Sequence, residues 1–248
     1  MLSLEIWEIA ILVAAGIAGG AINVMAGGGS ILTVPVMIFL GVPGPLANGT
    51  NRVAILAQNL TAITTFRRQG FSHFKLSLSL AACAVPGAVL GAWFGASLSG
   101  ETFNKLLSLV MIAVLILMQT GNRKIETDGE PRRLVLGHLL MAAAGFWGGF
   151  IQIGMGFIIM PILNRVMGLD LVTVNVHKVF IVAVYTTAAL AVFAFTSEVL
   201  WLVGAILAVG NSIGGYLGAK LTIARGEKLI RRVLTVAIIA MVIRLLFF

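Results

Sequence analysis

Residues 26–35 of the chain read AGGGSILTVP, and they place three consecutive glycines directly before a short apolar run that contains Pro35. That run, 30–41, spans only about 16 Å as a helix at about 1.5 Å per residue, whereas a hydrocarbon core is about 30 Å thick. A similar pattern returns at 154–161 as GMGFIIMP, which contains Pro161 and opens a second short run, 154–164. The sequence therefore predicts two broken or half-depth helices, each introduced by a glycine-rich turn.

The composition around these runs predicts an integral membrane protein. Of the 248 residues, 59% are hydrophobic and 10% are charged, whereas about a quarter of the residues of a soluble domain are charged. The apolar runs are too long and continuous for barrel strands, so helices within a lipid bilayer are expected. The single cysteine, Cys83, excludes an internal disulfide, and we expect no metal or other cofactor. The net charge of +8 first reports membrane orientation, and no nucleic-acid partner is expected.

The hydropathy pattern divides the chain into ten apolar segments, of which all but the two short runs are near the twenty residues that cross a bilayer. The segments are 4–26, 30–41, 46–66, 74–98, 102–120, 134–152, 154–164, 171–195, 198–218 and 228–247. If they alternate, Lys and Arg gather in the loops of one side, and only Lys105 and Arg244 fall on the other. Because basic loops stay in the cytoplasm, we expect a multi-pass protein of the cell (inner or plasma) membrane with its N-terminus outside. Glu5 and Glu8 replace the basic region of a signal peptide, so the first segment should be retained.

The two halves of the chain repeat one pattern of glycines and polar residues. Gly19-Gly20 followed by Asn23 returns as Gly148-Gly149 followed by Gln152. Two sets of glycines four residues apart, which are typical of closely packed helices, also correspond: Gly87, Gly91 and Gly95, and Gly210, Gly214 and Gly218. Five segments per half is an odd number, so the second copy must lie upside down. We expect an all-α polytopic membrane protein of two inverted repeats, 1–120 and 134–248, joined by a cytoplasmic linker, 121–133.

Each half also carries one cation seventeen residues after its proline, Arg52 in the first half and Lys178 in the second. All nine acidic residues lie at segment ends or in loops, so neither cation has a carboxylate partner at depth. An unpaired cation in the hydrocarbon costs at least about 3 kcal/mol, and a bound anion would offset that cost. We therefore expect both cations to face one small anionic substrate near mid-membrane. The alternative is that both lie shallow and reach the outer headgroups.

Polar residues near the cations complete the expected substrate site. Asn48, Thr50 and Asn51 precede Arg52, and His177 precedes Lys178. His177 is the candidate for carrying protons, because it titrates near neutral pH. Further candidates follow the first glycine turn or lie on the membrane helices, where the glycines could instead form a kink and the amides could instead join helices: Gly28, Gly29, Ser30, Asn23, Gln58, Asn59, Gln152 and Tyr185.

These motifs together resemble the TauE/SafE family of membrane permeases, which are described as sulfite exporters and transporters of organosulfonates and related sulfur anions. The resemblance rests on AGGGSILTVP and NGTNRVA (48–54), and on their second copies, GMGFIIMP and VNVHKVF (174–180), and it covers both halves. It implies proton-linked or gradient-driven movement of a sulfite, organosulfonate or thiosulfate anion across the cell membrane. By position it points at Gly27 to Ser30 with Pro35, Asn48 to Arg52, Gly154, Gly156, Pro161, and Asn175 to Lys178. The second copy departs from the fuller pattern, with Met155 and Phe157 where more glycine is usual.

Three functions are compatible with these residues. The favoured one is a secondary transporter rather than an enzyme, in which one half rocks against the other around the two cations. An anion channel would also use broken helices and a basic lining. An intramembrane hydrolase would need Ser30 as nucleophile and His177 as its base, with no carboxylate at depth to orient the histidine.

Overall fold

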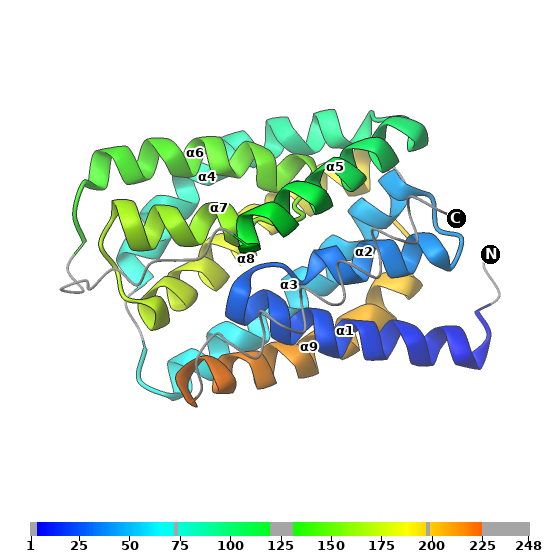
Figure 1. Ribbon diagram of the computed structural model, residues 1–248, viewed down its shortest axis with the longest axis horizontal. Coiled ribbons are helices and arrows are strands. Elements are labelled where there is room, and N and C mark those ends of the chain that lie inside the picture. Colours follow the sequence, from blue (N-terminus) through cyan, green and yellow to red (C-terminus); the bar gives the residue numbers. More distant parts are fainter. Residues whose placement is uncertain (1–3, 72–73, 120–130, 197–198, 225–248) are drawn as a thin grey trace.

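The computed structural model describes residues 4–71, 74–119, 131–196 and 199–224, and over these ranges its regular structure is helical (Figure 1). The elements are α1 (Ile6–Ala26), α2 (Ser30–Phe39), α3 (Gly44–Arg68), α4 (Phe74–Ala96), α5 (Gly100–Gln119), α6 (Leu134–Phe150), α7 (Gly156–Pro161), the π-helical turn η1 (Ile162–Val166), α8 (Leu171–Thr196) and α9 (Trp201–Ala224). The all-α prediction is confirmed, and helix ends differ from the expected ones by a few residues. The last expected segment, 228–247, and most of the linker 121–133 lie outside the described residues.

The helices differ in hydropathy and in how many polar side chains they bury. Among those described, α1, α4, α8 and α9 have both the length and the hydropathy of a membrane span. They and their neighbours expose large apolar side chains such as Trp93, Leu139 and Leu202, which suits contact with lipid. Helix α3 has 25 residues but buries a polar set: Asn48, Thr50, Asn51, Arg52, Gln58, Asn59 and Thr65. The polar stretch NGTNR, residues 48–52, is thus surrounded by protein.

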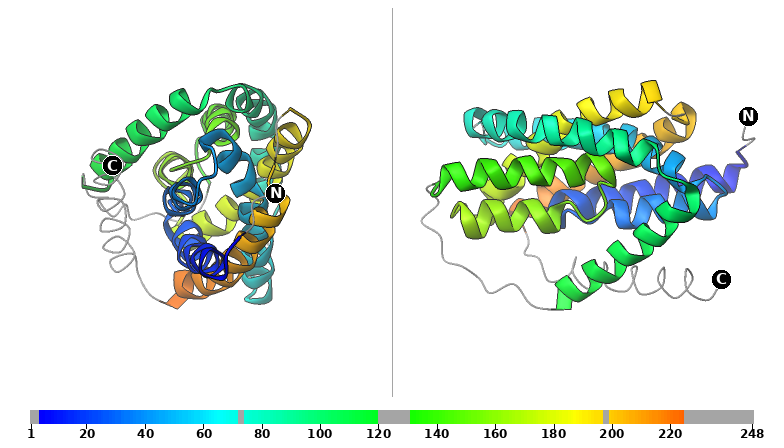
Figure 2. Two further views of the ribbon diagram at one scale, coloured as in Figure 1. Left: turned by 90° about the vertical axis from the view of Figure 1, so that its right-hand side faces the viewer. Right: turned by 90° about the horizontal axis from the view of Figure 1, so that it is seen from above.

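Two long helix pairs frame the molecule, α1 with α9 and α6 with α4, and between them α3 packs on α8 and α9 while α4 packs on α8 (Figures 1 and 2). Exchanging α1 for α6, α3 for α8 and α4 for α9 maps these pairs onto one another. The four-spaced glycines lie in the outer pairs: a Cβ on Gly91 would overlap the carbonyl of Phe146 on α6, and one on Gly214 would overlap that of Ile17 on α1. The prediction that these glycines pack helices closely is confirmed.

The two glycine-rich turns meet in the interior. Gly27 ends α1 with a left-handed φ of 79°. The backbone amide of Gly156, at the start of α7, donates a hydrogen bond to the carbonyl of Gly27 (N–O 3.1 Å). The Cα atoms of these glycines lie so close that a Cβ on either would overlap the backbone of the other. The short helices then begin, α2 after Gly29 and α7 after Met155. At Pro161, which has no amide hydrogen, α7 passes into the π-helical turn.

The loop before α8 carries one acidic cap. The carboxylate of Asp170 accepts the backbone amides of Val172 and Thr173, each at 3.0 Å. Partial burial alone would raise the pKa of this carboxyl, but the hydrogen bonds from Thr173 and Val172 outweigh it and hold the pKa below its ordinary value. Asp170 thus stabilises the start of the helix that carries Lys178.

Candidate functional site

Arg52 contacts the end of α6, a helix of the other half. Its guanidinium donates to the carbonyls of Gly148 (Nη1–O 3.0 Å) and Gly149, and to the side-chain oxygen of Gln152 (2.9 Å). The guanidinium carbon lies 4.5 Å from the centre of the Phe193 ring. The Arg52 side chain is fully buried within the protein, which favours the interior position over contact with the outer headgroups.

Asn48 completes the same helix end. A helix leaves its last four carbonyls without intrahelical partners. At α6, the carbonyl of Trp147 accepts backbone amides of the following turn, Arg52 takes the next two, and the Asn48 side chain donates to the carbonyl of Phe150 (2.9 Å). The negative end of a helix dipole thereby faces the arginine. A capped helix end, in place of a carboxylate, is the partner of this buried cation among the described residues.

Lys178 makes the reciprocal contact. From α8 it reaches the end of α1 in the other half, where its ammonium donates to the carbonyl of Val24 (2.7 Å) and to the side chain of Asn175 (2.6 Å). The next neighbour is the sulfur of Met160, at 3.9 Å. Only 3% of the lysine is exposed, and in the described part of the chain no carboxylate pairs with it. Each cation therefore caps the first helix of the opposite half.

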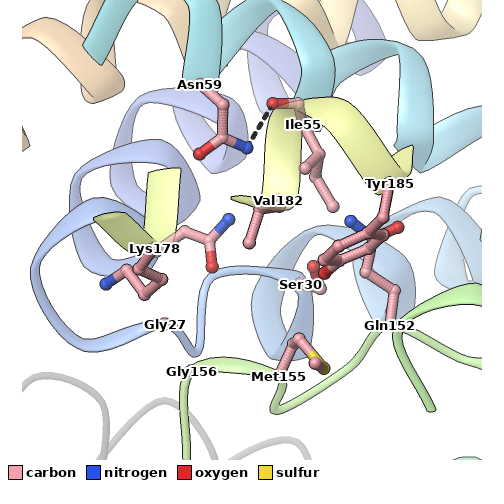
Figure 3. Close-up of a pocket in the computed structure, with 11 residues that line it drawn as sticks. Gly27, Ser30, Ile55, Asn59, Gln152, Met155, Gly156, Lys178, Val182 and Tyr185 are labelled. Carbon is pink, nitrogen blue, oxygen red and sulfur yellow. Dashed lines mark hydrogen bonds between the residues drawn. The ribbon is translucent and has the colours of Figure 1, made fainter. Parts of the chain in front are cut away.

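A small pocket lies beside the meeting point of the two glycine turns (Figure 3). Its volume of about 10 Å³ is what one water-sized sphere occupies. Figure 3 shows Lys178 on one side, its nitrogen pointing away from Tyr185, with Tyr185, Gln152 and Ser30 on the other side. The lining residues are Asn23, Gly27, Ser30, Ile55, Asn59, Gln152, Met155, Gly156, Lys178, Val182 and Tyr185.

Six of the predicted substrate residues thus line one pocket, contributed by both halves: Asn23, Ser30, Asn59, Gln152, Lys178 and Tyr185. The Tyr185 hydroxyl is buried and has no hydrogen bond within the described part of the chain. The hydroxyl of the neighbouring Thr186 accepts from Gln152 (3.0 Å). Gln152 itself has a left-handed φ of 60°, a conformation that costs free energy for a residue with a side chain. The pocket wall therefore contains Gln152, whose backbone is strained, and Tyr185, whose hydroxyl has no partner among the described residues.

The other predicted residues lie one layer away, where they bond to the protein. Asn51 donates to Ser30 (3.2 Å) and accepts from Thr33 (2.7 Å). Thr50 accepts the backbone amide of Leu200 (3.1 Å), and the ring of His177 hydrogen-bonds Ser77 (2.6 Å). The pair that a hydrolase would need is absent from the described residues, since Ser30 bonds to Asn51 and not to His177.

The first glycine turn also has a packing role. The carbonyls of Gly28 and Gly29 accept the first backbone amides of α2, from Ile31, Leu32 and Thr33. A Cβ on Gly29 would overlap the carbonyl of Gly19 on α1. Gly29 therefore lies within the close contact of α2 with α1, and neither glycine lines the pocket.

Gln58 belongs to a buried amide cluster that sequence reasoning described only in part. Its side-chain oxygen accepts from Asn23 on α1 and from Asn211 on α9, each at 3.3 Å. Asn211 is absent from the sequence-based candidates, although an amide within the largely apolar helix α9 was a signal. Thr33, Thr186 and Ser77 were missed as well, because a small hydroxyl in a membrane helix has no distinguishing pattern.

Comparison with known proteins identifies the family of the chain. The model of the family described as "Sulfite exporter TauE/SafE" matches residues 12–245. A probable membrane transporter protein, ORF9, of Sinorhizobium sp. is 29% identical over 96% of this chain and 92% of its own length. A probable membrane transporter protein of Haemophilus influenzae is 27% identical over 90% of this chain and 88% of its own. For the probable membrane transporter protein YfcA of Escherichia coli, the identity is 26% over 92% of this chain and 86% of the relative. The chain belongs to the TauE/SafE family of membrane transporters.

Proposed function

We propose that the protein is a secondary transporter that carries a small sulfur-containing anion, such as sulfite, an organosulfonate or thiosulfate, through the pocket beside Lys178. The observation that carries the proposal is Lys178, a buried lysine that lines a pocket with no carboxylate among its lining residues. An ammonium has three N–H donors, and only two of those on Lys178 have oxygen partners. The name of the matching family supports sulfite as the first anion to test.

The remaining polar groups of the pocket suit an anion. Ser30 and Tyr185 have hydroxyl hydrogens, and Asn23, Asn59 and Gln152 have amide hydrogens. The Tyr185 hydroxyl has no partner in the described structure, so it is available as a donor. Ile55, Met155 and Val182 complete the lining with apolar atoms, which keep the local dielectric low and strengthen the attraction between ammonium and anion.

Transport would follow alternating access between two inverted halves with the N-terminus outside. The correspondence of helix pairs and of the two reciprocal caps supports this arrangement, as do the opposite directions of α1 and α6 along the long axis of Figure 1. A pocket of about 10 Å³ is closed to a hydrated anion, which favours a carrier over an open channel. Helix movements must therefore open the pocket to each side in turn.

The test is uptake of labelled sulfite by proteoliposomes. Lys178→Gln keeps a donor for Val24 but removes the charge, so the KM for sulfite should rise at least about tenfold, as expected for the loss of a charged hydrogen bond. Lys220→Gln is the matched control, because Lys220 lies exposed over the ring of Tyr216, and it should leave the KM unchanged. Unaltered uptake by Lys178→Gln would contradict the proposed site, and an ohmic current in place of saturable uptake would favour the channel.

A further inference from the structure

We infer that the two corresponding cations have different tasks: Lys178 contacts the anion, whereas Arg52 is a positioning residue that acts on the pocket through Gln152. The inference rests on the proposed function, since it assumes that the anion binds beside Lys178. Its basis is that Lys178 lines the pocket whereas Arg52 does not, although both lie at the same place in the repeated pattern.

Three N–H groups of Arg52 are directed at acceptors in the protein, while its buried Nε has no hydrogen-bond partner among the described residues. Both hydrogens of Nη1 are used, on the Gly148 carbonyl and on Gln152, and Nη2 donates to the Gly149 carbonyl. Phe193 lies over the guanidinium, and Arg52 is absent from the residues that line the pocket. A planar fork that bridges successive carbonyls is specific to arginine, because a lysine ammonium is a single point charge.

Lys178, by contrast, lines the pocket, and one N–H group of its ammonium has no oxygen partner in the described structure. Two of its hydrogens meet oxygens, and the Met160 sulfur at 3.9 Å is a weak acceptor. An arriving anion can therefore take one N–H without breaking the cap on Val24. An anion that drew the Arg52 guanidinium away would instead leave the carbonyls of Gly148 and Gly149 without partners.

Gln152 is the link between Arg52 and the pocket. Its side chain is held at both ends, the oxygen by Arg52 (2.9 Å) and the nitrogen by Thr186 (3.0 Å), while its backbone has a left-handed φ of 60°. A backbone held in this region persists only where its surroundings maintain it. Removing the guanidinium would release the Gln152 side chain from its place in the pocket wall, while every residue that lines the pocket stays in the chain.

A double-mutant cycle on the KM for sulfite tests this coupling. Gln152→Ala should raise the KM about three- to tenfold, and Arg52→Lys should raise it by a similar factor although the charge is kept. The double variant should resemble the single ones within about twofold, because both changes remove the same constraint. Combining Gln152→Ala with Lys178→Gln should instead multiply the two effects, since Lys178 contacts the anion by itself. Arg67→Lys, at the exposed end of α3, is the control with unchanged KM.

Arg52→Lys is chosen because the larger change, Arg52→Gln, leaves a helix end uncapped and is the variant more prone to misfold. A wild-type KM in Arg52→Lys would overturn the inference, as it would show that charge alone matters at this position. Fully multiplicative effects of Arg52→Lys and Gln152→Ala would overturn it as well. Failure of the proposed function is recognised separately, by unaltered uptake in Lys178→Gln.

Discussion

The hydroxyl of Tyr185 provides a prediction in which stability and binding change in opposite directions. This hydroxyl is buried beside the pocket and has no partner among the described residues. The ring is held in place by close packing, since a Cβ on Gly148 would come within 2.8 Å of it. Tyr185→Phe therefore removes one oxygen atom and should leave the ring where it is.

The two magnitudes follow from what the oxygen contacts in each state. In the empty carrier, an unpaired buried polar group costs about 1–3 kcal/mol, so its removal should raise the melting temperature by a few degrees, at about 2–4 °C per kcal/mol for a chain of this size. With an anion bound, the hydroxyl would donate a charge-assisted hydrogen bond worth about 1.5–3 kcal/mol. Losing that bond should raise the KM about ten- to a hundredfold.

The assay combines thermal unfolding in detergent, without substrate, with labelled sulfite uptake in proteoliposomes. Tyr216→Phe is the matched control, because Tyr216 is 41% exposed and its ring packs under Lys220; it should change neither quantity. A Tyr185→Phe protein that is less stable and transports with a wild-type KM would refute the reasoning, because it would show that the hydroxyl serves the empty protein rather than the anion.

Three further predictions concern packing, protons and acid stability. Gly91→Ala should lower stability by about 1–3 kcal/mol, because its Cβ would overlap a backbone carbonyl of α6, whereas Gly100→Ala, with no atom within 4 Å of its Cβ, should not; equal melting temperatures would contradict the close packing of α4 on α6. If His177 carries the coupled proton, His177→Asn should abolish the stimulation of uptake by a pH gradient while counterflow exchange continues, and a retained stimulation would assign the proton elsewhere. The pKa of Asp170 is lowered in the folded protein, so the stabilisation by its carboxylate is present above the unfolded pKa and is lost as the pH falls through the folded pKa. Asp170→Asn should therefore reduce the fall in melting temperature on acidification. An unchanged dependence of the melting temperature on pH would rule out this cap as its source.

Much of the architecture could be predicted from local pattern. Hydropathy and length predicted the helices, the glycine-to-proline modules predicted the two short ones, and four-residue glycine spacing predicted where helices approach closely. These features depend on neighbours along the chain or one helical turn away, so the order of residues carries the information. The burial of Arg52 and Lys178 was also predictable, since each lies in an apolar segment with other polar residues nearby.

The partners of the buried cations could not be predicted in this way. The lack of any acidic residue at depth led to the expectation that an anion supplies the missing counter-charge of both. For Arg52 the structure shows carbonyl groups from about a hundred residues away in the chain, and for Lys178 a carbonyl from the start of the chain. Backbone carbonyls are present in every residue, so sequence does not reveal which of them lack partners.

The sequence by itself therefore determined a helical membrane protein, because the hydrophobic effect and the cost of unpaired backbone in lipid act on composition and on local spacing. Only the tertiary structure decided which helix ends lie in the interior and which side chains reach them. That choice depends on how α1 and α6 end against the opposite half, and it separates a cation that caps a helix from one that also borders a pocket.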